Sequence, residues 1–176
     1  MNHNIIDRDS ILKDCNNIQL KLNTRSITIY TLLTIVGIAT LGVTPFSDDP
    51  SSALNMALIV GGVSLIATAI VQLSRNYLHL VYTPSGSSLT KGSEYFENEK
   101  IGIMKSLLEE CNTTQLKEIK MKSGGNGRID FFVSGDGNFA AVQLFSYIPY
   151  NYETASRIYY FSNDDAQHIR RWLIKK

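Results

Sequence analysis

Residues 26–47 read SITIYTLLTIVGIATLGVTPFS, and residues 50–74 read PSSALNMALIVGGVSLIATAIVQLS. Neither run contains Asp, Glu, Lys, Arg or His, although 19% of the whole chain is charged. An α-helix needs about 20 apolar residues to cross the hydrocarbon core of a bilayer, and both runs reach that length. We therefore predict a membrane protein with two transmembrane helices, over about 26–46 and 53–73, which form one hairpin within residues 26–74.

A buried helical hairpin in a soluble protein is the alternative, but it needs enough surrounding protein, and only residues 75–176 follow. A cleaved signal peptide fits less well, because the first run begins only at Ser26 and no small-residue cleavage pattern follows it. Threonines make the first run less apolar, but their hydroxyl groups can bond to carbonyl groups of their own helix within a membrane. These threonines are Thr28, Thr31, Thr34, Thr40 and Thr44.

The charged residues that flank the two runs predict the orientation of the hairpin. Lys and Arg mark the cytoplasmic side of a membrane protein. The turn TPFSDDPSS at residues 44–52 carries only Asp48 and Asp49, whereas basic residues stand before the first run and after the second. We therefore expect the inner membrane as the location, with both termini in the cytoplasm and the turn outside. The basic residues are Arg8, Lys13, Lys21 and Arg25 before the first run, and Arg75 and Lys91 after the second.

Small residues in the two runs predict where helices pack in the lipid bilayer. Without a hydrophobic driving force in lipid, helices associate where small residues let their backbones approach closely. These contacts either hold the two spans of one chain together, which we favour, or join several hairpins by self-association. Neither run contains an ionisable residue, which counts against a proton-driven transporter. The candidate packing residues are Gly37, Gly42, Ala57, Gly61 and Gly62.

Residues 1–25 predict a cytoplasmic amphipathic helix. Ile11, Cys15, Ile18 and Leu22 recur at spacings of 4, 3 and 4, which places them on one helix face. Such a stripe either covers the C-terminal domain of the same chain, which we favour, or lies on the membrane surface or on a partner subunit. Cys15 and Cys111 would both face the reducing cytoplasm, so we expect no disulfide.

Residues 75–176 predict a small cytoplasmic α+β domain, an antiparallel meander flanked by helices in the order β-α-β-β-β-β-α. The hairpin signal SGDGN at 134–138 precedes a strand at 139–148 that is apolar on both faces, and is therefore either central or covered by another element on its second face. A C-terminal helix follows Ser162, with Asp165 in position to close a capping box. The other expected elements are a strand at 78–83, a loop at 84–93, a helix at 94–110 capped by Ser93, and strands at 119–122, 129–133 and 157–161.

Tyrosines concentrate around the predicted loop PYNYETAS at 149–156. Tyr147, Tyr150 and Tyr152 are candidate binding residues, because amphipathic rings contact protein partners or stack on planar ligands. Arg157 beside them could hold a small anionic ligand. Cross-strand aromatic pairing is the alternative for rings on the strands, which leaves Tyr150 and Tyr152 as the stronger candidates.

The sequence gives few signs of an enzyme, so we expect no catalytic residues, no metal and no cofactor. His3, His79 and His168 have no metal-ligand spacing, and two lone cysteines do not form a metal site. The glycine-rich segments SGGNG and SGDGN are each expected to join two strands, whereas a phosphate-binding loop opens a helix. From Ser74 onward there are 13 Lys and Arg against 11 Asp and Glu, a balance too even to predict nucleic acid binding.

The leading hypothesis is a non-enzymatic integral membrane protein whose cytoplasmic domain binds a ligand or a protein partner. Its hairpin would anchor the chain or self-associate, and in one version it is a bacterial defence-type effector that breaches the membrane. The alternative is an immunity protein or an accessory subunit of a secretion or conjugation complex. The plan of two spans and one small domain is similar to those of bacterial antiphage membrane effectors, membrane-bound immunity proteins and such accessory subunits, a likeness of layout alone.

Overall fold

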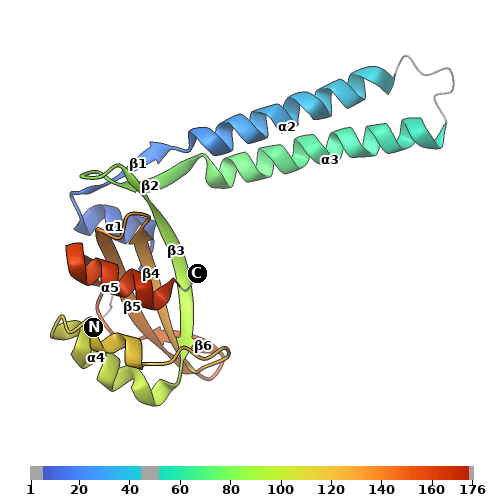
Figure 1. The fold of residues 1–176 in the computed structure, drawn as a ribbon. Coiled ribbons are helices and arrows are strands. Elements are labelled where there is room, and N and C mark those ends of the chain that lie inside the picture. Colours follow the sequence, from blue (N-terminus) through green and yellow to red (C-terminus); the bar gives the residue numbers. More distant parts are fainter. Residues whose placement is uncertain (1–5, 45–51, 175–176) are drawn as a thin grey trace. The chain divides into compact units, whose positions relative to one another are not determined.

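The computed structural model describes residues 6–44 and 52–174, and the chain folds as two compact units (Figure 1). One unit comprises residues 20–79 and contains the two longest helices. The other comprises residues 1–19 together with 80–176 and contains the α+β fold. The described residues form five α-helices and one sheet of seven strands.

The two longest helices are α2 (Thr24–Val43) and α3 (Ala53–Asn76). Both are long and apolar enough to cross a membrane. Each begins at a polar cap, because the side chains of Asn23 and Ser52 each accept a backbone hydrogen bond of 3.2 Å. α2 starts slightly earlier than the predicted first span, and the last two residues of that span lie outside the described residues.

The two helices pack along a seam of residues spaced three and four apart, the spacing of one helix face. Gly37 and Gly62 are buried in this seam. A Cβ atom on either glycine would lie 2.9 Å from the carbonyl oxygen of the other, so the two backbones are in direct contact. Other seam residues are Tyr30, Leu33, Thr40 and Leu41 on α2, and Leu58, Leu65, Ile66 and Ala69 on α3.

The sheet is antiparallel, and its strands follow the order β1-β2-β3-β4-β5-β6, with β7 beside β5. β6 and β7 share one edge of β5: β6 pairs with its end at 145–148 and β7 with its start at 139–142. The antiparallel meander is therefore confirmed. The strands are β1 (Ile18–Leu22), β2 (Leu78–Tyr82), β3 (Ser87–Phe96), β4 (Gly127–Ser134), β5 (Phe139–Ile148), β6 (Asn151–Thr154) and β7 (Tyr159–Ser162).

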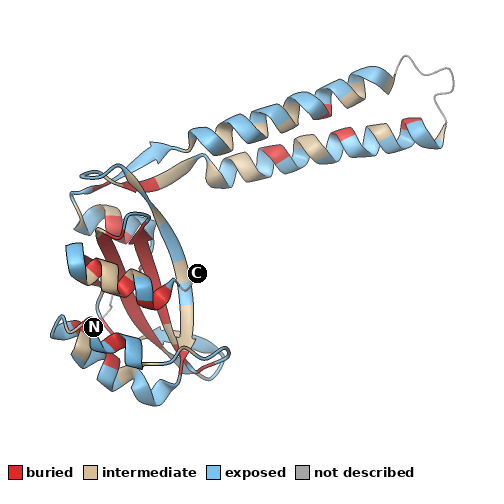
Figure 2. Ribbon diagram, viewed as in Figure 1, coloured by how far each residue is buried: buried red, intermediate tan, exposed pale blue. Residues whose placement is uncertain are grey.

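Both faces of the sheet are covered, which makes β4 and β5 almost wholly buried (Figure 2). On one face, α4 (Ile101–Glu109) and α5 (Asn163–Leu173) pack over Ile129, Val142 and Leu144. On the other face, Ile6 and α1 (Arg8–Asp14) pack over the rings of Phe132, Phe139 and Phe145. The prediction that the strand at 139–148 is buried on both sides is confirmed for residues 139–145, whereas its last three residues are partly or fully exposed.

The predicted SGDGN hairpin is confirmed and joins β4 to β5. Gly137 has a φ of +78°, which suits glycine. The carboxylate of Asp136 organises the turn, because it accepts hydrogen bonds from the backbone N–H and the side-chain amide of Asn138 at 3.2 and 2.8 Å. Burial raises the pKa of Asp136, but hydrogen bonds from Ser134, Ser85 and Asn138 outweigh this effect and lower the pKa to about 2.

The predicted loop at 84–93 and helix at 94–110 are partly wrong, because residues 87–96 form the long strand β3. β3 pairs with β4 without interruption from Leu89 to Phe96, and this pairing overrides its polar composition. Ser93 is therefore not a helix cap. The helix begins only at Ile101, after a 3₁₀ turn at Asn98–Lys100.

The strand predicted at 119–122 is also wrong. A 3₁₀ turn at Gln115–Glu118 precedes this segment, and Ile119 and Met121 pack against the core beneath α4 and α5 instead of joining the sheet. The segment SGGNG therefore does not join two strands. The order after residue 75 is β-β-α-β-β-β-β-α, because β3 is gained, 119–122 is lost, and β6 occupies part of the predicted loop at 149–156.

Two helix predictions at the ends of the chain need correction. Helix α1 ends at Asp14, and Ile18 and Leu22 belong to strand β1, so no single stripe runs along residues 1–25; residues 1–5 lie outside the described residues. Ile11 is buried against the sheet, as the favoured interpretation expects. Ser162 stands at the start of α5 but makes no capping hydrogen bond with its side chain, so the capping box is absent.

Candidate functional site

Four aromatic side chains gather near Arg128 on the sheet face that carries α1. The register places Tyr95 of β3, Arg128 of β4 and Phe145 of β5 opposite one another. Tyr147 of β5 is opposite Tyr152 of β6. Directly opposed residues of antiparallel strands share a face, so these side chains contact one another. We call these five residues the Arg128 cluster.

The guanidinium of Arg128 is held by two rings and one carboxylate. Its central carbon lies 4.6 Å from the ring centroids of both Phe145 and Tyr152. Its Nε and Nη2 atoms lie 2.9 and 3.0 Å from the carboxylate oxygens of Asp130, a buried residue. A desolvated cation–π contact contributes about 2 kcal/mol. Because Asp130 neutralises the guanidinium, the cluster presents an aromatic surface and not a free positive charge.

The three tyrosines predicted to bind a partner lie close together but differ in exposure. Tyr147 and Tyr152 form an edge-to-face pair with centroids 5.3 Å apart, and Tyr152 is half-buried. Tyr150 is 99% exposed at the turn between β5 and β6, where its φ of +71° is uncommon for a residue with a side chain. Its backbone N–H donates to Tyr147 Oη at 3.2 Å. Tyr147 and Tyr150 are thus the accessible rings of this region.

Arg157 lies apart from these tyrosines in its contacts. Its guanidinium carbon is 5.3 Å from the ring centroid of Tyr159, on β7. The hydroxyl of Tyr159 donates to Glu109 Oε1 at 3.1 Å, and burial together with this hydrogen bond raises the pKa of Tyr159. A shallow pocket between α4 and β7 includes Arg157, Glu109 and the exposed Cys111. The cation that joins the tyrosine cluster is Arg128, which the sequence did not single out.

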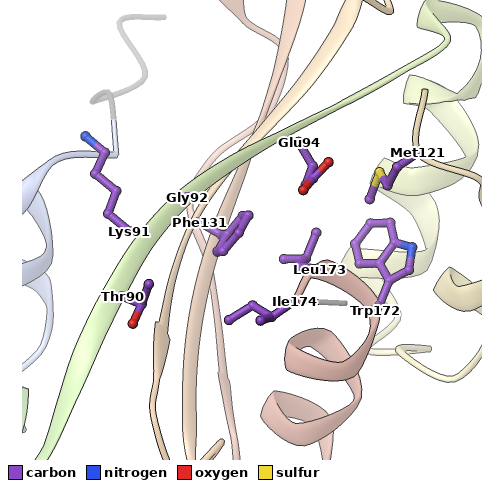
Figure 3. A pocket seen from close by; sticks show the side chains of 9 residues that line it. All are labelled: Thr90, Lys91, Gly92, Glu94, Met121, Phe131, Trp172, Leu173 and Ile174. Carbon is purple, nitrogen blue, oxygen red and sulfur yellow. The ribbon is translucent and has the colours of Figure 1, made fainter. Parts of the chain in front are cut away.

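A separate pocket of about 290 Å³ lies between β3 and the last turn of α5 (Figure 3). Its walls are mainly apolar, and Gly92 opens space for the ring of Phe131, which occupies the position that a Cβ on Gly92 would need. Glu94 is the acidic group at the pocket. The lining residues are Thr90, Lys91, Gly92, Glu94, Met121, Phe131, Trp172, Leu173 and Ile174.

A wider groove of about 690 Å³ lies between α4 and residues 115–122. Ile103, Leu107 and Ile119 give it an apolar floor. Its rim is charged and includes the exposed ion pair between Lys122 Nζ and Glu97 Oε1, 2.9 Å apart. Lys100, Glu118 and Lys120 also line the groove, so it carries charges of both signs.

The buried Thr113 connects α5 to the segment after α4. Its hydroxyl donates to Asp165 Oδ1 at 2.7 Å and lies 3.2 Å from His168 Nδ1. This contact explains why Asp165 does not cap α5: its carboxylate bonds to Thr113. Among residues 6–44 and 52–174, no group of three His, Cys, Asp or Glu side chains is arranged to hold a metal ion.

The small residues of the hairpin divide into two sets. Gly37 and Gly62 form the seam between α2 and α3. Gly42, Ala57 and Gly61 are exposed, and a Cβ on either of these two glycines would have no heavy atom within 4 Å. The sequence therefore identified the seam but could not separate it from the outer faces.

Comparison with known proteins gives no match: no family model, curated protein or solved structure is significantly similar to this chain.

Proposed function

We propose that the protein is an integral membrane protein whose hairpin anchors it in the inner membrane and whose cytoplasmic α+β domain binds a partner. The observation that carries this proposal is the exposure of large apolar side chains on α2 and α3. Only 6% and 17% of the two candidate spans is buried within the protein, unlike the core helices of soluble proteins. The exposed side chains are Ile29, Leu32, Ile35, Val36, Ile38 and Val43 on α2, and Leu54, Met56, Ile59, Val60, Val63, Ile70 and Val71 on α3.

The energy of this exposure supports lipid as the surrounding medium. Full burial of one such side chain contributes about 1.5–3 kcal/mol, and these residues are 41–70% exposed. If water surrounded the hairpin, the protein would forgo on the order of 10–20 kcal/mol of burial free energy from these side chains together. The whole stability of a typical domain is only about 5–15 kcal/mol. Lipid chains cover such a surface, whereas water does not.

The flanking charges support the proposed orientation. Lys21 lies in β1 just before α2, Arg25 lies in the first turn of α2, and Arg75 lies in the last turn of α3. Asp48 and Asp49, which lie outside the described residues, are the charged residues between the two helices. By the preference of Lys and Arg for the cytoplasmic side, the α+β unit faces the cytoplasm.

Several polar side chains of the α+β unit are already paired within the protein. Arg128 is bonded to Asp130, and Thr113 to Asp165. The accessible groups are aromatic and apolar: Tyr147 and Tyr150 at one end of β5, and the pocket beside β3. Exposed aromatic rings and apolar pockets are both common anchors of protein recognition, so a polypeptide is the partner that these two separate places suit best.

The outer faces of the hairpin support an association with further helices. Gly42, Ala57 and Gly61 leave room for a close helix contact beyond the seam. A second hairpin of the same chain would give the effector version of the function. In the alternative, this chain is an immunity protein or an accessory subunit of an envelope complex, and the contacting helix belongs to another protein.

A cysteine-labelling experiment in intact cells tests the membrane anchor and its orientation. With Cys15 and Cys111 replaced, one variant carries Ser51→Cys between the spans and the matched variant carries Ser123→Cys, at an exposed position of the α+β unit. A membrane-impermeant maleimide should label the first variant after outer-membrane permeabilisation, and the second only after lysis. The opposite labelling, or recovery of the intact chain in the soluble fraction without detergent, would disprove the proposal.

A further inference from the structure

Strand β3 has an unpaired edge in the middle of the sheet. β2 pairs with β3 only at Ser87 and Ser88, whereas β4 pairs with β3 as far as Phe96. Beyond Ser88, the side of β3 that faces away from β4 therefore has no strand beside it among the described residues. Figure 2 shows β3 as exposed and intermediate, in contrast to the buried strands β4 and β5.

The hydrogen bonds at both ends of β3 identify the backbone groups that point toward this open edge. Ser88 O accepts from Gly135 N–H on the β4 side, whereas Tyr95 O accepts from Lys122 N–H on the other side, at 3.0 and 2.7 Å. Successive residues of a strand direct their backbone groups to alternate edges. The N–H and C=O groups of Lys91 and Ser93 therefore face away from β4.

The apolar pocket lies directly beside this open edge. Thr90, Gly92 and Glu94 alternate along β3 on the face that carries α5, and all three line the pocket. Figure 3 shows Phe131, Leu173 and Trp172 grouped on that face, with Glu94 directed toward them. Glu94 makes no ion pair or hydrogen bond with any residue of the described ranges 6–44 and 52–174.

We propose that the edge of β3 at residues 91–93 binds an extended polypeptide segment as an additional strand. The backbone of the segment would pair with Lys91 and Ser93, one apolar side chain would enter the pocket, and a basic side chain two residues away would meet Glu94. Recognition by strand addition takes its affinity from main-chain hydrogen bonds and its specificity from pockets for alternate side chains. This inference rests on the proposed binding function and names the class of partner.

The size of the site favours a peptide segment over a second copy of the chain. A stable protein interface buries about 1,200–2,000 Å² in total, far more than two edge residues and one small pocket provide. A pocket of about 290 Å³ is at the lower limit for ligand pockets, so it suits one side chain.

The chemistry of β3 also disfavours self-pairing. In a symmetric antiparallel pair centred on Lys91, the two lysines would stand directly opposite each other, and like charges in that position destabilise a sheet. In other registers, the second β3 would still present Thr90, Gly92 and Glu94 to the pocket, none of which fills an apolar space. A heterologous segment with an apolar residue meets both requirements.

Peptide selection tests this inference with the full-length protein in detergent micelles. The probe is a phage-displayed library of random peptides of about nine residues, long enough to form one strand. We expect an enriched family that carries an apolar residue and a Lys or Arg two positions away. Glu94→Lys should shift the selected family from basic to acidic at that position.

Two pairs of variants locate the binding site of the selected peptide. Ser93→Pro removes an N–H that points away from β4, whereas Ser93→Ala keeps it, so only the proline should weaken binding by at least about tenfold. Ile174→Glu, at the exposed rim of the pocket, should weaken binding while Ile174→Val does not. Circular dichroism should show the same folded spectrum for all four variants.

Three results would overturn the inference: no enriched peptide family, equal binding by Ser93→Pro and the parent protein, or equal binding by Ile174→Glu and the parent. If the parent protein has the mass of a dimer in detergent micelles and the Ser93→Pro variant has the mass of a monomer, the edge of β3 binds a second copy instead. Failure of this test leaves the membrane-labelling result unaffected, and a soluble protein that still binds such peptides would refute only the anchor.

Discussion

Replacing Gly62 with alanine should weaken the packing of α2 on α3, whereas replacing the adjacent Gly61 should not. A Cβ on Gly62 would lie 2.6 Å from Thr40 Oγ1, 2.8 Å from Leu41 Cγ and 2.9 Å from Gly37 O. The leucine can rotate, but the carbonyl oxygen moves only if the helices separate. A Cβ on Gly61 would meet nothing within 4 Å.

The magnitude follows from two opposing effects. Overpacking of this kind costs about 1–3 kcal/mol, and the higher helix propensity of alanine returns about 1 kcal/mol at either position. Thr40 cannot turn away freely, because its hydroxyl donates to Gly37 O at 2.7 Å. The two alanine variants should therefore differ in the free energy of helix separation by about 1–3 kcal/mol, with Gly62→Ala the less stable.

Pyrene excimer fluorescence measures this difference. Pyrene labels on cysteines at Thr24 and Ser74 report contact between the helix ends, which the hydrogen bond from Asn23 N–H to Tyr77 O, 2.8 Å, holds together. Titration with dodecyl sulfate in mixed micelles should separate the helices at a lower detergent fraction for Gly62→Ala than for Gly61→Ala. Equal midpoints for the two variants would refute the seam and its contact at Gly37.

Three further predictions concern the α+β unit. Arg128→Ala should destabilise it by about 3 kcal/mol in chemical denaturation, because it leaves the buried Asp130 carboxylate unpaired, whereas the double change Arg128→Met with Asp130→Leu should cost clearly less. Trp172→Phe should cost about 1–2 kcal/mol in the same assay, because it leaves Ile119 O without the indole N–H that donates to it at 3.2 Å. Asp136→Asn should lower the melting temperature at neutral pH, because the ionised Asp136 carboxylate stabilises the folded state. The pKa of Asp136 is about 2 in the folded state and about 3.9 in the unfolded state, so this stabilisation is lost as the pH falls from about 4 to about 2. The melting temperatures of the parent and the variant should converge in that range.

The features that the sequence predicted correctly are those encoded locally. The uncharged runs became α2 and α3 because helix length and apolar composition are properties of consecutive residues. The hairpin at Gly137 and the doubly buried strand β5 likewise follow from neighbouring residues. The apolar face of α5, with Ile169, Trp172 and Leu173 buried, also has a periodic signal in the sequence.

Strand β3 could not be predicted because its structure depends on a partner distant in sequence. Its segment SSLTKGSEYF is polar and contains only one fully buried residue, Phe96. Pairing with β4 satisfies one edge of its backbone, and Gly92 lets the ring of Phe131 lie across it. Neither contact leaves a signal within residues 87–96 themselves, so local propensity suggested a loop and a helix start.

The Arg128 cluster escaped sequence reasoning for a related reason. A single arginine at the start of a strand carries no pattern of its own, and its partners come from β5 and β6. Only the register that places Arg128 opposite Phe145 shows that the guanidinium meets aromatic rings. Arg157 is near the tyrosines in sequence, but it lies between β6 and β7, and its guanidinium contacts the ring of Tyr159 on β7.

Backbone groups that lie beside no strand are hydrogen-bonded on β5 but not on β3 within the described residues, and this difference supports strand addition at β3. Between β6 and β7, the outer edge of β5 is closed by single contacts: Ala155 N–H donates to Leu144 O at 2.8 Å, and Leu144 N–H donates to Ser156 Oγ at 3.0 Å. The buried side chain of Gln143 adds a hydrogen bond of 3.1 Å to Ser156 O. Both backbone groups of Leu144 are therefore hydrogen-bonded, although no strand is formed by residues 155–158 between β6 and β7. On β3, the backbone groups of Lys91 and Ser93 have no such closure among the described residues, although an apolar pocket and an unpaired carboxylate lie beside them. Among the described residues, unpaired backbone groups and an apolar pocket thus occur together at residues 91–93, the combination that strand addition by another polypeptide requires.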